Sequence, residues 1–404
     1  MRRNIASPQW NRLGTRALRE ARHAMLALSY ATGLGIAELG ARWVLGRWGN
    51  YYAYAPFERA QLELGAGLVS PSRTTVRMEI NCLGERADPP PHPTEKAFRA
   101  LVVGGSAAEC RFLDQNATWS AVAQRLLGTA EHLVSLGVRR VHVGNTSRSI
   151  LRCEDLAVLL AKILPRYAQL DMIVLMVGGA DVVSWVESGM PPALTASPPN
   201  LDKIFEEHPE GPWGWRPSET ALWYLARGLR RRTLRPVSRG RSADWLPRLR
   251  RLRAETPARL DAVPDPAPML DGVEKGLGRL LSVARTRTER IVLVRQPWFG
   301  PTPTKEEEAL FWNFGLGRPY KEPVSSYLTP RAVDALMRAM DARVSAVAAS
   351  AGVEQVDTLA TLERSRRTFY DELHLTPEGA EEVGRLAVEG ILASVRRRPL
   401  HRGS

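Results

Sequence analysis

Short runs of apolar and β-branched residues alternate with longer segments of helical periodicity over most of the chain after residue 98. The strongest apolar runs predict strands at 100–104, 140–144, 172–177, 291–295 and 353–356. Apolar positions at helical spacing predict helices at 117–136, 153–166, 330–351 and 376–395. The run from Met172 to Val177 is apolar throughout, as expected for a strand that helices cover on both faces. This alternation predicts an α/β domain with a mostly parallel sheet.

The first of these strands ends in a pattern that suits a reactive side chain. It is followed by Gly104, Gly105 and Ser106, so the serine falls where the strand turns into the next helix. Open parallel sheets bind ligands at the carboxyl ends of their strands, and glycines allow a sharp turn there. Many Gly-Gly-Ser turns only close a strand or bind phosphate. Ser106 is therefore a candidate nucleophile that needs a partner.

A second stretch, far along the chain, supplies that partner. Asp371 and His374 lie just before the last predicted helix, for which Thr376 is the expected N-cap. A serine hydroxyl needs a base within hydrogen-bond reach, and that base needs a third group to orient it. We expect His374 to take the proton of Ser106 and Asp371 to orient the imidazole. The alternative is that the Asp-x-x-His pair merely pins the start of a helix.

Composition adds little to this picture. In 404 residues an apolar fraction of 44% is enough for a sizeable core, and 56 basic against 43 acidic residues give a net charge of +13. Such an excess is compatible with nucleic acid, a membrane surface or an acidic polymer, but the chain has no recognisable nucleic-acid motif, and we expect no nucleic-acid partner. Cys82, Cys110 and Cys153 are odd in number and lack metal-ligand spacing. We expect them to be small buried hydrophobes, with no disulfide framework, metal or cofactor.

The N-terminal part resembles a signal anchor in its layout. Residues 1–23 form an arginine-rich tail, and residues 24–46 form a mostly apolar helix. A basic flank before an apolar segment is retained in the cytoplasm, which predicts membrane association and a following domain outside the cytoplasm, in the periplasm or at the cell surface. The alternative is an amphipathic helix that lies on the membrane or packs on the domain. A cytoplasmic location is the alternative to the outward-facing one.

The remaining segments complete the expected organisation. Residues 47–97 read as an extended lead-in that ends in a proline-rich linker, the α/β domain covers 98–397, and 398–404 form a tail. Residues 190–270 interrupt the alternation with a segment rich in proline, arginine and tryptophan, including Trp213, Trp215, Trp223 and Trp245. Aromatic and arginine side chains together can stack on sugars or bases. The simpler interpretation is a helical insertion that packs its tryptophans on the domain and turns its arginines outward.

These motifs together resemble the SGNH hydrolases, also called the GDSL family of esterases and lipases. Gly104-Gly105-Ser106 matches the first family block, and Asp371-Glu-Leu-His374 matches the last; the resemblance covers roughly residues 98–397. Glu38-Leu-Gly-Ala-Arg42 after an apolar helix is similar to the membrane-anchored bacterial members. The resemblance implies a three-layer α/β/α sandwich with a mostly parallel, flavodoxin-like sheet, and a catalytic triad of Ser106, His374 and Asp371.

Two blocks depart from the family pattern, and both concern the oxyanion hole. Ser147 stands where family members usually have a glycine, and Ala180 stands where they usually have an asparagine. The resemblance then implies an oxyanion hole built from the amides of Ser106 and Ser147, with Asn145 as a substitute side-chain donor. Loss of one such donor typically costs on the order of a hundredfold in turnover. Asp181 is expected to have a structural role.

The resulting expectation is a serine-dependent acyl-ester hydrolase or acyltransferase that forms an acyl-enzyme on Ser106. An O-acetyl or other short acyl ester on a cell-surface glycan is the favoured substrate, because an outward-facing, membrane-tethered domain would meet such polymers. A lipid ester is the nearest alternative. The alternative from another class is a catalytically degenerate domain that binds a glycan or a protein partner without turnover.

Overall fold

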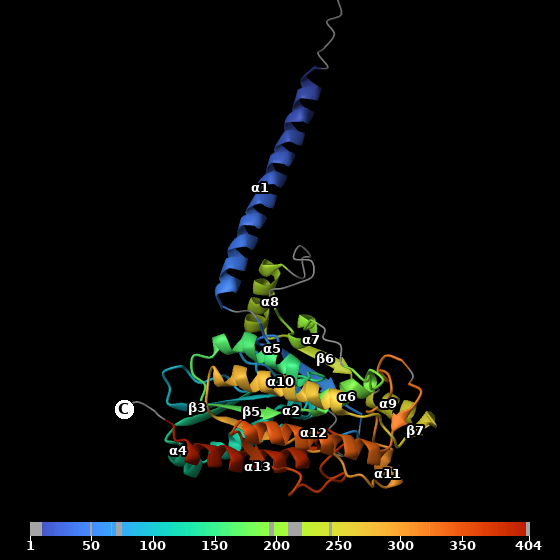
Figure 1. The fold of residues 1–404 in the computed structure, drawn as a ribbon. Coiled ribbons are helices and arrows are strands. Elements are labelled where there is room, and N and C mark those ends of the chain that lie inside the picture. The colour runs from blue at the N-terminus through green and yellow to red at the C-terminus, as the bar shows by residue number, and fades with distance from the viewer. Residues whose placement is uncertain are drawn as a thin grey trace, which may run out of the picture. The chain divides into compact units, whose positions relative to one another are not determined.

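The computed structural model describes residues 10–48, 51–65, 67–69, 75–193, 198–208, 220–241, 245–322 and 324–400. These residues form two compact units, one made of 10–48 with 220–229 and the other of the remaining residues (Figure 1). Trp213 and Trp215 lie outside the described residues.

The larger unit is built on a sheet of five parallel strands in the order β10-β8-β5-β3-β4. The strands are β3 (Ala97–Gly104), β4 (Arg140–Asn145), β5 (Met172–Met176), β8 (Ile291–Val294) and β10 (Glu354–Val356). Numbered along the chain, their order is 2-1-3-4-5, which is the flavodoxin-like arrangement. All five expected strands are present, and β3 starts three residues earlier than the sequence predicts.

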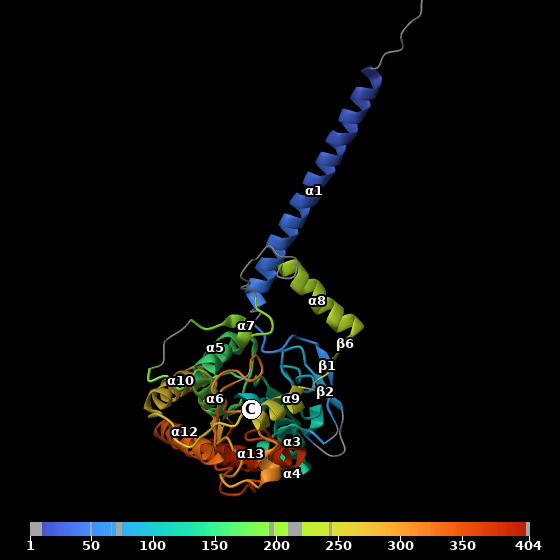
Figure 2. The same ribbon diagram turned by 90° about the vertical axis from the view of Figure 1, so that its right-hand side faces the viewer.

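Helices cover both faces of this sheet (Figure 2). One face carries α5 (Cys153–Ile163), α6 (Gly179–Glu187), α10 (Ala267–Arg285) and α12 (Pro330–Ser350), and the other carries α3 (Trp119–Leu127), α4 (Ala130–Leu136) and α13 (Pro377–Arg397). The side chains of β5 alternate between the two cores: Ile173 and Leu175 face the first layer, and Val174 and Met176 face the second. The expected three-layer α/β/α sandwich is confirmed. The helix expected at 117–136 is divided at Gly128, which ends α3.

The described residues of the lead-in from 51 onward belong to the larger unit, so the expectation that the domain begins at residue 98 is wrong. Its β1 (Arg59–Glu63) pairs antiparallel with β2 (Thr75–Glu79) and parallel with β6 (Val237–Arg241), a strand of the insertion. The buried guanidinium of Arg86 donates hydrogen bonds to backbone carbonyls of 109, 110 and 113. These carbonyls lie at and just after the end of α2, so the lead-in supports the segment that follows the first turn after the central strand β3.

The insertion is less purely helical than expected. It contains α7 (Leu201–Ile204), α8 (Ala221–Leu234) and α9 (Trp245–Glu255), together with β6 and the short β7 (Arg259–Leu260), which pairs with β9 (Tyr327–Leu328). Short helical segments elsewhere are α2 (Ser106–Glu109), η1 (Gln115–Ala117), η2 (Leu164–Arg166) and α11 (Lys305–Glu308). β6 pairs with β1 and β7 pairs with β9, and these partners lie far away in the sequence. Local periodicity could therefore not predict β6 and β7.

The smaller unit contains α1 (Trp10–Trp48), which is longer than the apolar segment that the sequence marks. Large apolar side chains along it are exposed, among them Leu28, Leu34 and Leu39. The stretch Arg19–Leu45 is long and apolar enough to cross a membrane, a property that signal sequences share.

Candidate active site

Ser106 lies at the carboxyl end of β3, as the first residue of α2. The turn requires Gly104, because a Cβ atom there would lie 2.3 Å from the carbonyl oxygen of Met176 on β5. This close approach of two central strands carries the chain into α2 and leaves the Ser106 side chain at the sheet edge where α/β proteins bind ligands.

Asp371 and His374 are presented by a tight loop between residues 369 and 375. Phe369 and Leu375 form an antiparallel bridge, and the amide of Tyr370 donates to the carbonyl oxygen of His374 at 3.0 Å. The loop leads directly into α13, whose N-cap Thr376 accepts from the amide of Gly379 at 3.1 Å, as the sequence predicts. The loop thus directs both side chains to one place.

The structure brings the three predicted triad residues together. Nε2 of His374 lies 2.8 Å from Oγ of Ser106, and Nδ1 lies 2.7 Å from Oδ2 of Asp371. The Asp371 side chain is fully buried, whereas that of His374 retains 13% exposure. The alternative, in which the Asp-x-x-His pair only pins a helix, does not account for the contact with a serine 268 positions away. The arrangement is that of a nucleophile, a base and an orienting carboxylate.

The charges at this site reinforce one another. Burial by itself would lower the pKa of His374, but the Asp371 carboxylate outweighs it and raises that pKa above its ordinary value. Burial would likewise raise the pKa of Asp371, yet the imidazole and the amides of residues 373 and 374 lower it below its usual range. Asp371 is therefore an anion at neutral pH and stabilises the protonated imidazole.

Two of the expected oxyanion donors are already engaged in hydrogen bonds. The amide of Ser147 donates to Oδ1 of Asn145 at 2.9 Å. Nδ2 of Asn145 donates to the carbonyl of Ala108 and to Oγ of Ser120, and Asn145 is buried. The expectation that Ser147 or Asn145 supplies a free donor is not met in this arrangement. The amide of Ser106 remains, since the first amides of a helix have no acceptor within it.

The third block lies beside the nucleophile. Gly178 has a φ of +105°, which only glycine adopts easily, and α6 begins at the next residue. A Cβ placed on Gly105 would lie 3.5 Å from Cβ of Ala180, so Ala180 is next to the Ser106 turn but carries no side-chain donor. Asp181 is buried and accepts from the amide of Cys153 at the start of α5. Its contact is structural, in agreement with the expectation.

Trp312 is a site residue that the sequence reasoning missed. Its indole Nε1 donates to Oδ2 of Asp371 at 2.8 Å, and its ring lies nearly parallel to the His374 ring, with centroids 6.3 Å apart. Buried Glu372 holds it in place by accepting the amides of Trp312 and Asn313. Trp312 lies between α11 and β9, in the long segment that follows the carboxyl end of β8, and this position was the signal that could have found it.

The insertion contributes α9 to the surroundings of the triad. Trp245 packs edge-on against Trp312, with ring centroids 5.0 Å apart, and keeps 36% of its surface exposed. Arg250 donates to the carbonyl of Tyr370 at 2.8 Å, and Arg253 is buried. The interpretation that tryptophans pack on the domain holds for Trp245. The accompanying expectation that the arginines face outward is wrong for Arg250 and Arg253, because backbone carbonyls bind them.

The cysteines do not extend the site. Burial raises the pKa of the Cys110 thiol to about 11 and that of Cys153 well above its ordinary value. Cys82, expected to be buried, is exposed. Within the part of the chain that the structure describes, no group of three or more His, Cys, Asp or Glu side chains could hold a metal ion.

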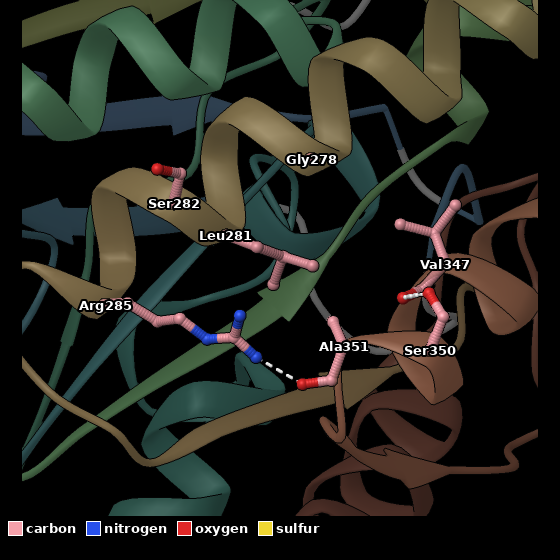
Figure 3. Close-up of a pocket in the computed structure, with 7 residues that line it drawn as sticks. All are labelled: Gly278, Leu281, Ser282, Arg285, Val347, Ser350 and Ala351. Carbon is pink, nitrogen blue, oxygen red and sulfur yellow. Dashed lines mark hydrogen bonds between the residues drawn. The ribbon is translucent and has the colours of Figure 1, made fainter.

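A surface pocket of about 350 Å³ lies between the ends of α10 and α12 (Figure 3). Its lining includes Leu281, Arg285 and Val347, and the Arg285 guanidinium donates to the carbonyl of Ala351. These residues precede β8 and β10, so the pocket lies at the amino edge of the sheet, opposite the edge that carries Ser106.

No family model and no curated protein matches the chain. Among solved structures, the acetylxylan esterase Axe2 from Geobacillus stearothermophilus is 14% identical, with 73% of this chain and 94% of that chain covered and a TM-score of 0.36. A lipolytic G-D-S-L family protein from Veillonella parvula is 10% identical, with coverages of 72% and 97% and a TM-score of 0.36.

The fold is identified from the order and direction of the strands. A parallel 2-1-3-4-5 sheet between two helical layers is what the sequence resemblance implies, and Ser106, Asp371 and His374 meet at its carboxyl edge. The chain therefore has a flavodoxin-like three-layer α/β/α fold, which is the fold that its resemblance to the SGNH hydrolases implies.

Proposed function

We propose that the protein is a serine esterase that forms an acyl-enzyme on Ser106. The observation that carries the proposal is the continuous set of contacts from Oγ of Ser106 through both ring nitrogens of His374 to the buried carboxylate of Asp371. In such a reaction the buried carboxylate of Asp371 orients the imidazole and stabilises the positive charge that the imidazole acquires.

The contacts of Ser106, His374 and Asp371 support the following course for the proposed reaction. His374 Nε2 takes the Ser106 proton as Oγ attacks the ester carbonyl, and Asp371 stabilises the imidazolium. The same nitrogen then returns a proton to the leaving alcohol, which leaves the acyl group on Ser106. Water, or a second alcohol in a transfer reaction, attacks the acyl-enzyme by the reverse sequence. The amide of Ser106 stabilises the negative charge that develops on the carbonyl oxygen, because Ala180 has no side-chain donor.

Within this class we favour a short acyl ester on a glycan as substrate. The partly exposed indole of Trp245 packs on Trp312, which contacts Asp371, and it offers an apolar ring with a polar edge to a sugar ring. We further propose that α1 anchors the protein in a membrane, with the catalytic unit outside the cytoplasm. Its exposed apolar side chains and its length support this placement.

The test of the esterase proposal is active-site labelling of the full chain. A fluorophosphonate probe should label the wild type, and p-nitrophenyl acetate should be hydrolysed, whereas Ser106→Ala and His374→Ala should lose both reactions. Labelling that persists in Ser106→Ala would place the nucleophile elsewhere. A folded wild type that neither labels nor hydrolyses the ester would support the binding-module alternative instead.

The substrate class needs a separate comparison. An O-acetylated polysaccharide and a lysophospholipid are offered to the same preparation, and kcat/KM is measured for each. We expect the polysaccharide to be deacetylated faster, and Trp245→Ala to raise KM for it while leaving p-nitrophenyl acetate hydrolysis unchanged. Faster turnover of the lysophospholipid would favour the lipid-ester alternative.

A further inference from the structure

We propose that α8 is an interfacial helix that lies on a lipid bilayer, with its apolar face at the acyl boundary and its arginines among anionic headgroups. This inference rests on the membrane anchoring of α1 proposed above. It assigns a partner to a part of the insertion that the esterase chemistry does not use.

The first observation is an apolar stripe that faces outward. Leu222, Leu225, Ala226 and Leu229 follow the spacing i, i+3, i+4, i+7 and so share one face of α8. Leu225 is 41% exposed and Leu229 63% exposed, whereas Ala221 on another face is buried. A helix on a water-soluble domain turns such a stripe inward. The exposure of the apolar stripe on α8 indicates a surface that binds an apolar partner.

The second observation is the charge beside the stripe. Seven arginines and no acidic residue occur between positions 227 and 241. Arg231 forms an ion pair with Glu207, while Arg230 and Arg232 are exposed on either side of the stripe. Trp223, 45% exposed, lies near the same border. Apolar residues flanked by arginine and tryptophan are typical of helices that lie in the headgroup region of anionic membranes.

The third observation concerns the depth in the bilayer at which α8 begins. The Glu38 carboxylate of α1 accepts the amides of Ala221 at 2.9 Å and Leu222 at 3.0 Å, and Arg42 donates to it at 2.7 Å. Glu38 lies seven residues before the end of the apolar span at Leu45, or about 10 Å at 1.5 Å per residue. A carboxylate in such a span requires partners. The first turn of α8 supplies two of them, and it therefore starts near the boundary between hydrocarbon and headgroups.

The charge also argues against a second copy of the chain as the occupant. A symmetric contact through this face would set the arginines of one copy against those of the other, and juxtaposed like charges oppose association. An anionic bilayer satisfies both the apolar stripe and the arginines, and it is continuous with the proposed membrane span of α1.

The experiment places a fluorescent reporter on the stripe of the full-length protein. Cys82→Ser removes the exposed thiol, and Leu229→Cys is labelled with an environment-sensitive nitrobenzoxadiazole dye. Val134→Cys on α4, 82% exposed, is the matched control. Both proteins are reconstituted in vesicles of phosphatidylcholine with phosphatidylglycerol, or of phosphatidylcholine alone, and quenching by lipids that carry a shallow doxyl group is measured.

We expect the dye at position 229 to shift to the blue and to be quenched at least about twofold in the anionic vesicles. The dye at position 134 should remain accessible to aqueous iodide. Arg230→Gln with Arg232→Gln should reduce the quenching in anionic vesicles toward that in neutral ones.

Other outcomes overturn the proposal in distinguishable ways. If the protein floats with vesicles but the dye at 229 remains as exposed to iodide as the dye at 134, anchoring stands and the interfacial helix is refuted. A dye shielded from both iodide and doxyl lipid would show that a protein surface covers the stripe. A chain that does not float with vesicles would refute both the anchor and the helix, while the esterase assay remains independent of this result.

Discussion

At the scale of single residues, the hydrogen bonds that converge on Asp371 explain how this site is held. Its carboxylate accepts the amides of Leu373 and His374, the imidazole Nδ1 and the Trp312 indole. The two amides belong to the loop that carries Asp371, whereas the indole belongs to the segment between α11 and β9. Trp312 is thus positioned to stabilise the charge of Asp371 and to limit how strongly that charge acts on His374.

Substitution Trp312→Phe should move the pH profile of catalysis. A protonated His374 cannot accept the Ser106 proton, so kcat/KM falls as pH drops through the raised pKa of His374. Loss of the indole donor leaves more charge on Asp371 to bind the imidazolium and raises the pKa of His374 further. We expect the acidic limb of kcat/KM to shift to higher pH and kcat to fall about tenfold, since a hydrogen bond to a charged group contributes roughly 1.5–3 kcal/mol.

The matched control is Trp298→Phe. Trp298 is buried and donates to Oδ1 of Asp334 at 2.8 Å, a bond of the same kind and length with a carboxylate outside the triad. It should lower stability without moving the pH profile. An unchanged profile in Trp312→Phe would show that the indole only fills space.

Position 180 provides a second residue-scale prediction. Ala180→Asn places a side-chain amide next to the Ser106 turn and should raise kcat, by as much as about a hundredfold if the donor reaches the oxyanion. Ser147→Gly should leave kcat unchanged, because the amide at 147 donates to Asn145 with either residue. Both values come from steady-state kinetics with p-nitrophenyl acetate. A gain in Ser147→Gly and none in Ala180→Asn would reverse this assignment of the oxyanion hole.

The site residues that could be predicted are those whose role can be recognised from their immediate neighbours in the sequence. Ser106 follows a buried strand and two glycines, and Asp371 and His374 precede a capped helix, so each is visible in a short window. Trp312 could not be found in this way, because its role depends on a contact between loops 59 positions apart. The engagement of the Ser147 amide depends on the rotamer of Asn145, which no pattern specifies.

At the scale of elements, α9 links the insertion to the catalytic loop. Arg250 reaches the carbonyls of Leu310 and Tyr370, which lie just before Trp312 and Asp371, and Arg253 donates to the carbonyl of Asn313. The helix therefore joins the two loops that hold the carboxylate and its indole donor.

Arg250→Ala should weaken this connection. We expect kcat to fall about tenfold and the midpoint of thermal unfolding to fall by a few degrees, because the carbonyls of Leu68, Leu310 and Tyr370 lose a charged donor. Arg251→Ala, at an exposed position on the same helix, is the control and should change neither quantity. Equal behaviour of the two variants in kinetics and calorimetry would show that α9 only covers the domain.

The elements themselves differed in how far they could be predicted. Strands β3, β4, β5 and β8 of the central sheet are recognisable because both of their faces are buried, which favours apolar residues in the run. The edge strand β10 has only its last position buried. β2 alternates between buried and exposed or half-buried positions, β1 is mostly half-buried, and residues 237–240 of β6 are exposed or half-buried. β1 also pairs with a strand that begins at residue 237. Their pairing is non-local, so the same residues read as irregular in the sequence.

At the scale of the whole catalytic unit, the lead-in determines where the folding domain begins. Glu85 is buried and hydrogen-bonds the buried His142 of β4 at 2.9 Å, and Arg86 binds the carbonyls that follow α2. Removal of these residues leaves an unpaired histidine and bare carbonyls in the interior, which is costly.

A chain that begins at residue 98 should therefore fail to fold, whereas one that begins at 51 should unfold cooperatively. Circular dichroism during a thermal ramp distinguishes the two. Cooperative unfolding of the shorter chain at the same midpoint would restore the interpretation of residues 47–97 as a linker.

The separation of Ser106 from His374 has a consequence for the synthesis of the protein. The two residues lie 268 positions apart, and at 5–20 residues per second the ribosome takes roughly 15–50 s to pass from one to the other. Throughout that interval the serine is present without its base, and no ester can be cleaved. A nascent chain, or one that is cut before the last loop, is inert. The proposed reactive site is therefore completed only after residue 374 has been synthesised.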